Sequence, residues 1–213
     1  NVSLYNETNG KSILPTPVIG MVGVIDDIEK IIFMNAKNNE TLFIVGQDEN
    51  KFDGFLQSSL YQEIFCDNFL GQVPPINLKK EKHLYDFIMK LNENKIINSA
   101  HDISDGGLLP CMIEMLLLNE LGININLPNK IQIPNKENLI FLHGWLFGED
   151  QSRIMISTDQ PDKLEAFSKS ENIEIFCVGK TNDTGIVEIP KYDSICINKC
   201  SDLFYNTIPN LFS

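Results

Sequence analysis

The chain has 213 residues, 43% of them hydrophobic and 22% charged, and its formal net charge is −12. This balance is typical of a globular protein with a substantial core, and so large an acidic excess argues against a nucleic-acid-binding protein. No apolar run approaches the roughly 20 residues of a membrane helix, and no signal peptide is recognisable. We therefore expect a cytoplasmic protein with neither nucleic acid nor membrane as a partner.

The N-terminal part is predicted to contain a loop followed by strands. Residues 1–12 are polar and aperiodic and contain Asn-Gly, which indicates a loop. Residues 16–25 (TPVIGMVGVI) are apolar and β-branched, which predicts a buried strand. Further strands are expected at 30–34 and 41–46, then a short helix at 54–66 and a proline-marked connection at 71–78.

The rest of the chain alternates between helical and extended patterns. Apolar residues spaced by 3.6 predict a helix over Lys79–Leu91. A second helix is expected over Gly107–Leu121, with Pro110 in its first turn, where the missing N–H costs little. A third is expected at 160–170, and strands are expected at 95–103, 123–127, 153–158, 173–181, 185–189 and 194–197. The interleaving predicts an α+β (α/β layered) fold, with a mixed sheet and flanking helices.

The run SAHDISDGGLLP concentrates polar residues between a predicted strand and a predicted helix. Asp105 is expected to cap the helix, and the Gly-Gly pair after it leaves backbone amides open to an anion such as phosphate. Asp102 and Asp105 would then need a cation such as Mg²⁺ between them and the phosphate. A capped turn without a ligand explains the same residues equally well. His101 fits a hydrogen-bonded structural histidine better than a catalytic base.

The run LFGEDQSRIMIS is a second concentration of polar residues, at a predicted helix-to-strand junction. Its glutamine and arginine could bind an amide or a phosphate group. An exposed loop with solvated charges is the alternative. The polar residues are Glu149, Asp150, Gln151, Ser152 and Arg153.

Five scattered cysteines form no CxxC pair, and only three histidines accompany them. This pattern favours free or buried thiols in a reducing compartment over a zinc site or a disulfide framework.

Three motifs in one order, NVSLYNET…PTPVIGMVGVIDD, SAHDISDGGL and LFGEDQSR, carry a family resemblance. The chain resembles the C-terminal part of the phosphoribosylformylglycinamidine synthases, specifically the large catalytic subunit of the multi-subunit bacterial type. These enzymes belong to the aminoimidazole ribonucleotide synthetase superfamily. The resemblance runs from Asn1 to about residue 180. It implies that residues 1–26 end the second ATP-binding-type domain and that 27–213 form the C-terminal-type domain of the second half.

The resemblance implies an activity for the parent enzyme. It is an ATP-dependent ligase of purine biosynthesis that converts formylglycinamide ribonucleotide and glutamine-derived ammonia into formylglycinamidine ribonucleotide. ATP and Mg²⁺ are its implied cofactors. A glutaminase subunit, a small accessory subunit and the rest of the same chain are its implied partners. Because the family's catalytic histidines lie in the first half, no catalytic residue is expected here, and this chain alone is expected to be inactive.

The resemblance also implies roles for individual residues. Asn1 corresponds to a magnesium ligand, and Ser3 to a contact with the ribonucleotide substrate. Weaker candidates match first-half segments that contact metal and substrate, but they lie in the half where a vestigial nucleotide site is expected: Asp102, Asp105, Glu149, Gln151 and Arg153. Asp150 stands where the family usually has a serine, and an added carboxylate disfavours a role facing phosphate.

Two alternatives remain open from the sequence. The domain could act as a structural and assembly module with a vestigial nucleotide site. The chain could also be a related kinase or synthetase of the same superfamily, such as a selenophosphate or thiamine-phosphate kinase type, although NVSLYNET argues against this.

Overall fold

The computed structural model describes residues 7–13, 18–47, 54–66, 71–131 and 136–212. The chain divides into two compact units, Asn1–Ile31 and Ile32–Ser213. In the first unit, β1 (Glu7–Thr8) pairs with β2 (Lys11–Ser12) as a short antiparallel hairpin. Asn9 and Gly10, at φ values of 54° and 75°, form its two-residue turn, where both residues must adopt positive φ. A 3₁₀ helix, η1 (Ile28–Lys30), follows.

The strand predicted at 16–25 is wrong in its described part. Residues 18–25 form no strand, and the side chains of Val18 and Val22 are 91% and 101% exposed. An extended segment needs a neighbouring strand for its amides and carbonyls, and no described strand pairs with this one. The strand predicted at 30–34 is reduced to one bridge between Phe33 and Ser99.

The second unit is built on a mixed seven-stranded sheet in the order β4-β6-β3-β7-β5-β8-β9. Its neighbouring strands are antiparallel except for β5 and β8, which are parallel. The strands are β3 (Thr41–Val45), β4 (Ser99–Asp102), β5 (Gly122–Asn124), β6 (Ile154–Thr158), β7 (Ile175–Asn182), β8 (Ile186–Ile189) and β9 (Asp193–Cys196).

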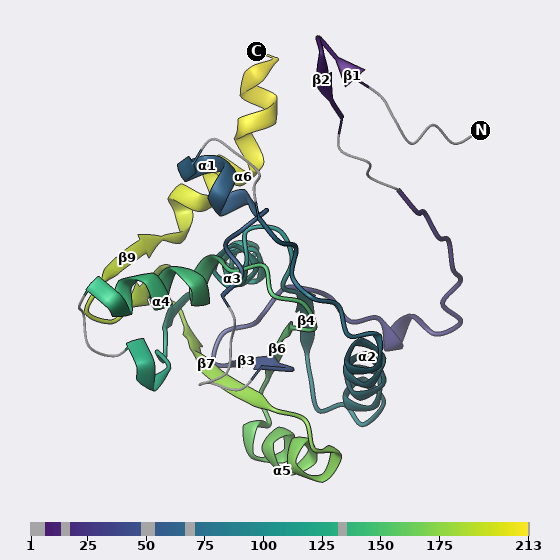
Figure 1. Cartoon of the computed structure of the whole chain (residues 1–213). Helices are drawn as coiled ribbons and strands as arrows, with labels where there is room; N and C mark the ends of the chain where they lie inside the picture. The colour runs from purple at the N-terminus through teal and green to yellow at the C-terminus, as the bar shows by residue number, and fades with distance from the viewer. Residues whose placement is uncertain (1–6, 14–17, 48–53, 67–70, 132–135, 213) are drawn as a thin grey trace. The chain divides into compact units, whose positions relative to one another are not determined.

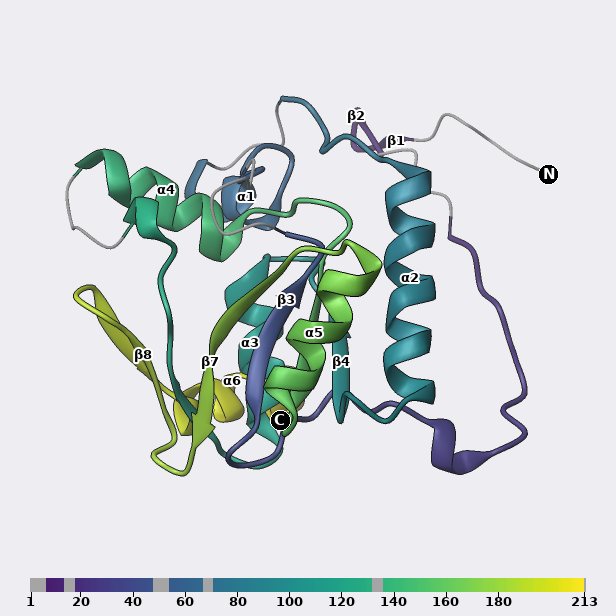
Figure 2. The same cartoon turned by 90° about the horizontal axis from the view of Figure 1, so that it is seen from below.

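Helices flank both faces of this sheet, so the predicted α+β class is confirmed. Helices α2 and α5 lie on one face and α3 and α4 on the other (Figures 1 and 2). The helices are α1 (Leu60–Cys66), α2 (Leu78–Glu93), α3 (Leu108–Leu117), α4 (Lys136–Phe147), α5 (Pro161–Glu171) and α6 (Ile197–Leu211), with the 3₁₀ helix η2 (Asn129–Ile131). Within the described residues, no helix combines the length and apolar character needed to cross a membrane.

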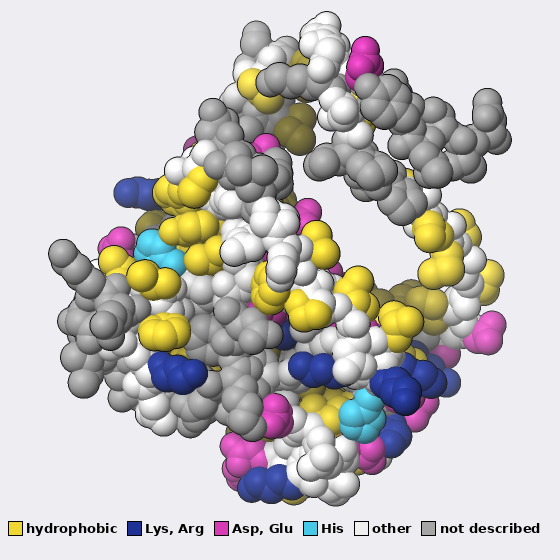
Figure 3. All heavy atoms as spheres, viewed as in Figure 1, with side chains coloured by type: hydrophobic (Ala, Val, Ile, Leu, Met, Phe, Trp, Pro, Cys, Tyr) yellow, Lys and Arg dark blue, Asp and Glu magenta, His cyan; other side chains and the backbone are white. Residues whose placement is uncertain are grey.

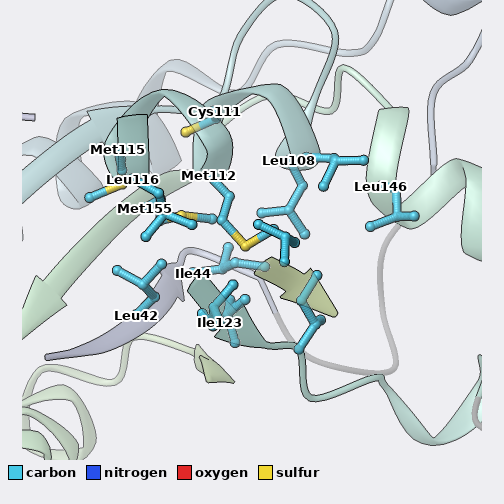
Figure 4. Packing of buried hydrophobic residues seen from close by; sticks show 14 of the residues in the cluster. Leu42, Ile44, Leu108, Cys111, Met112, Met115, Leu116, Ile123, Leu146 and Met155 are labelled. Carbon is cyan, nitrogen blue, oxygen red and sulfur yellow. The ribbon is translucent and has the colours of Figure 1, made fainter. Parts of the chain in front are cut away.

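Two buried clusters sit on opposite faces of the sheet because strand side chains alternate in direction. In β3, Leu42 and Ile44 belong to the cluster under α3 and α4, whereas Phe43 and Val45 belong to the cluster under α2 and α5. Figure 4 shows α3 covering the first cluster, with Met112 turned towards the strands. All five cysteines are free thiols, as predicted.

Candidate functional site

The antiparallel pairing of β4 with β6 brings the two polar motifs together. Asp102, the last residue of β4, lies opposite Ile154, the first residue of β6. The segment after Asp102 therefore lies beside the segment before Ile154. Glu149 joins them directly, because its Oε1 accepts hydrogen bonds from the amides of Gly106 (2.9 Å) and Leu60 (3.0 Å).

The turn into α3 is formed by glycine and not by the predicted Asp105 cap. Gly107 occupies the N-cap position at φ 81°, and no side chain caps this helix. A Cβ atom at Gly107 would lie 2.6 Å from the carbonyl carbon of Phe147, at the end of α4. The turn thus needs glycine for both its backbone conformation and its close approach to α4. Asp105 is exposed, and Pro110 lies in the first turn of α3, as predicted.

Arg153 is the centre of a buried polar network. Arg153 is only 4% exposed. The guanidinium donates to the carbonyls of Asp150 (3.1 Å) and Gly148 (2.5 Å) and to Oε1 of Gln47 (3.2 Å). Burial lowers the pKa of Arg153, and the nearby Asp150 carboxylate opposes that shift. Arginine nevertheless remains charged in proteins.

The Asp150 carboxylate is also engaged by the protein. It accepts hydrogen bonds from the amides of Gly54 (2.9 Å) and Phe55 (3.3 Å), and it lies 3.7 Å from Nη2 of Arg153. The Asp150 carboxylate, which departs from the family pattern, is therefore balanced by Arg153 and by backbone amides of the same domain. Gln151 is exposed, and its amide makes one long contact of 3.5 Å to the carbonyl of Glu149.

His101 is hydrogen-bonded on both ring nitrogens. Nε2 lies 2.8 Å from Oε2 of Glu114, and Nδ1 lies 3.2 Å from Oδ1 of Asp102. Desolvation raises the pKa of Asp102, but hydrogen bonds from Ser104 and His101 outweigh it, so the net shift is downwards. This arrangement agrees with the structural role predicted for His101.

A divalent cation such as Mg²⁺ needs several oxygen ligands around one point. No group of three or more His, Cys, Asp or Glu residues capable of holding a metal occurs in the described part of the chain. Asn1 and Ser3, the two strongest candidates from the sequence, lie outside the described residues. Among the described residues, Asp102, Asp105 and Glu149 therefore do not form a ligand cluster of this kind.

A cleft of about 380 Å³ opens beside Arg153. Two of its polar residues, Gln47 and Lys80, carry no functional prediction from the sequence. A polar residue two positions after the end of β3 and a lysine in the first turn of a helix are signals too common to single them out. The cleft is lined by Gly46, Gln47, Phe55, Pro74, Pro75, Ile76, Asn77, Lys80, Asp150, Gln151, Ser152 and Arg153.

Comparisons with curated proteins confirm the predicted resemblance. The chain is 39% identical over 185 residues to phosphoribosylformylglycinamidine synthase subunit PurL of Azorhizobium caulinodans, a match covering 85% of this chain and 23% of the relative. It is 37% identical over 170 residues to the same subunit of Caldanaerobacter subterraneus subsp. tengcongensis, covering 79% of this chain and 21% of the relative. The chain thus spans less than a quarter of the length of either relative.

Solved structures show the same fold. Thermotoga maritima PurL complexed with FGAR aligns with a TM-score of 0.65 at 15% identity, covering 82% of this chain and 30% of that chain. The same protein complexed with ATP aligns at 0.60 and 14% identity, covering 82% and 28%. The model of the AIR synthase related protein, C-terminal domain, matches residues 39–190. That match covers the sheet from β3 to β8 and both polar motifs, and the chain belongs to this family of C-terminal domains.

Proposed function

We propose that this chain is the C-terminal part of the large subunit of a phosphoribosylformylglycinamidine synthase. The parent enzyme uses ATP to convert formylglycinamide ribonucleotide and glutamine-derived ammonia into formylglycinamidine ribonucleotide. The observation that carries this proposal is the 39% identity to a named PurL subunit over 85% of the chain. Residues 1–26 would end the second ATP-binding-type domain, and 27–213 would form the C-terminal-type domain.

The cofactors and partners belong to the parent enzyme. ATP and Mg²⁺ are proposed for the full-length protein, with Asn1 as a metal ligand and Ser3 as a substrate contact. Thermotoga maritima PurL has been solved with ATP, and also within an assembly named PurLQS. By analogy, a glutaminase subunit, a small accessory subunit and the rest of the same chain are the proposed partners. The proposed location is the cytoplasm.

A structural role within that enzyme is the second proposal, and it has its own support. Glu149, Asp150 and Arg153 bind backbone groups of this chain, and Asp150 and Arg153 also contact each other, so their hydrogen-bonding capacity is largely used inside the domain. Such residues stabilise a scaffold and need not contact a reacting group. Asp102, Asp105 and Gln151 would then border a vestigial nucleotide site.

Activity assays test both proposals. The 213-residue chain alone is expected to form no formylglycinamidine ribonucleotide from formylglycinamide ribonucleotide, ATP, Mg²⁺ and ammonia. Supplying the preceding part of a PurL subunit, in cis or in trans, is expected to restore synthesis. Activity of the chain alone, or no activity of the combined protein, would contradict the first proposal. A rise in melting temperature of the isolated chain with ADP and Mg²⁺, beyond the rise that inorganic phosphate produces, would contradict a purely structural role.

A further inference from the structure

The cleft beside Arg153 contains a buried amide group without a hydrogen-bond partner. Gln47 is 4% exposed, and its Nε2 is a buried side-chain atom for which the described structure offers no acceptor. A buried donor left unsatisfied costs about 1–3 kcal/mol. An unsatisfied group of this kind in a folded protein calls for an explanation, and a bound ligand that supplies the missing acceptor is one.

The orientation of this amide is fixed by its neighbour. Oε1 of Gln47 accepts from Nη1 of Arg153 at 3.2 Å. Because the guanidinium carries only donors, turning the amide over would set N–H against N–H. The unsatisfied group at the cleft is therefore an N–H donor, and its missing partner must be an acceptor.

The described residues that line the cleft carry a charge opposite to that of the chain. Two of them, Lys80 and Arg153, are basic, and one, Asp150, is acidic, with oxygens that already accept from backbone amides. The N-terminus of the 16-residue helix α2 also lines it, through the N-cap residue Asn77 and through Lys80 in the first turn, and places the positive end of the helix dipole there. Glu81 in the same turn accepts a hydrogen bond from Ser152 Oγ at 2.5 Å.

The remaining walls of the cleft are apolar. Phe55, Pro74, Pro75 and Ile76 line it together with the donors described above. An apolar pocket with a few convergent polar groups is typical of a small-molecule site. The amide donor needs an acceptor, the basic residues favour an anionic one, and the walls can accommodate an apolar or planar body.

We propose that this cleft binds the phosphate group of a small phosphate ester. Nε2 of Gln47 donates to a phosphate oxygen, and Lys80 and the N-terminal turn of α2 supply positive charge. Arg153 orients the Gln47 amide through its hydrogen bond to Oε1. The body of the ester lies against Phe55 and the two prolines. The site does not depend on synthase activity, since phosphate binding to the isolated chain is measurable directly.

Calorimetric titration of the 213-residue chain, at constant ionic strength set with chloride, tests the site with two probes. Inorganic phosphate tests the anion-binding groups, and phenyl phosphate tests the apolar walls as well. We expect saturable binding of both probes, with phenyl phosphate several-fold tighter. Absence of saturable binding of either probe up to tens of millimolar would overturn the proposal.

Two substitutions and one matched control locate the site. Lys80→Gln removes a charge in the cleft, whereas Lys79→Gln removes the adjacent charge on the same helix, which does not line it. Gln47→Glu keeps an acceptor for Arg153 but replaces the donor with a carboxylate. We expect about tenfold weaker phosphate binding for Lys80→Gln and loss of binding for Gln47→Glu, with Lys79→Gln unchanged.

Thermal melting without phosphate shows whether each variant is folded. Equal weakening by Lys80→Gln and Lys79→Gln would overturn the proposal, because it would indicate general attraction to the helix surface. Unchanged binding by a folded Gln47→Glu variant would overturn it as well.

Discussion

At the residue scale, the Glu149 carboxylate holds two loops together through one oxygen. Glu149→Ala would leave the amides of Gly106 and Leu60 without their acceptor. Hydrogen bonds to a charged group contribute about 1.5–3 kcal/mol, and Leu60 is partly solvated. We expect a free energy of unfolding lower by about 1–3 kcal/mol in urea denaturation.

Two comparison variants isolate this contribution. Glu149→Gln keeps Oε1 as an acceptor and is expected to lose less stability than Glu149→Ala. Gln151→Ala, two residues away and exposed, is expected to stay within about 0.5 kcal/mol of the unchanged chain. Equal stability of Glu149→Ala and Gln151→Ala would show that these hydrogen bonds add nothing.

Arg153 is the residue whose loss is expected to cost the most. Arg153→Met removes the donors to Gly148, Asp150 and Gln47 and leaves the Asp150 carboxylate without its buried cation. Breaking a buried pair in this way costs about 3–5 kcal/mol. Equilibrium unfolding would measure the loss, with Lys80→Gln, at an exposed position, as the control for charge alone. A loss below about 1 kcal/mol would contradict the network.

The cysteines differ in reactivity because their burial differs. Burial raises the pKa of Cys111, with Glu114 and Asp102 adding to the shift, so this thiol stays protonated and unreactive. Cys66, at the end of α1, is exposed. With iodoacetamide at pH 8, mass spectrometry is expected to find Cys66 alkylated first and Cys111 alkylated only after unfolding in urea. Similar rates at both cysteines in the folded chain would refute this.

At the element scale, the local sequence pattern was sufficient to predict elements that form their own backbone hydrogen bonds or have a regular apolar face. The amphipathic helix predicted over Lys79–Leu91 is found as α2, and the apolar run at 153–158 is found as β6. The run at 18–25 is also apolar and β-branched but forms no strand, since composition does not supply a pairing partner.

The site was only partly predictable for the same reason. Glu149 and Arg153 are recognisable as a polar concentration, but their partners come from distant segments. Gln47 lies 106 residues from Arg153, and Gly106 lies 43 residues from Glu149. Strand pairing creates these contacts, and no local spacing encodes them.

The start of α3 gives an element-scale prediction. Gly107→Ala would place a Cβ against the backbone of Phe147 and Gly148, which cannot move without displacing the end of α4. Gly106→Ala is the matched control, since it also has positive φ but meets the ring of Pro110. We expect Gly107→Ala to lower the melting temperature more than Gly106→Ala. The opposite order would show that α3 does not depend on close approach to α4.

At the scale of the molecule, the Ile32–Ser213 unit leaves apolar side chains uncovered. Figure 3 shows hydrophobic side chains gathered over α1 and α4. Among the described residues these include Ile64 and Phe65 of α1 and Ile140 and Phe141 of α4, which are 46–72% exposed. Contiguous exposed apolar patches mark surfaces that contact other protein segments. The chain spans under a quarter of the length of its relatives, which supplies such segments in a larger protein.

The two core clusters share the strands of one sheet, and this sharing predicts cooperative unfolding of the Ile32–Ser213 unit. In β6, Met155 belongs to one cluster, while Ile154 and Ile156 belong to the other. Neither face can lose its packing without exposing strands that the other face needs. Trp145, the single tryptophan of the chain, lies in the α3–α4 cluster and is 1% exposed, so its fluorescence reports on that face.

Phe87→Ala tests this coupling from the opposite face. Phe87 is 1% exposed in α2, and its ring centroid lies 5.7 Å from that of Phe167. Removing the ring is expected to lower the free energy of unfolding by about 3–5 kcal/mol. The urea midpoint from Trp145 fluorescence should fall together with that from far-UV circular dichroism, because both report one transition. Tyr85→Ala, 57% exposed on the same helix, should move neither midpoint by much. If the Trp145 midpoint stays in place while the circular dichroism curve splits into two steps, the two faces unfold independently and the shared sheet does not couple them.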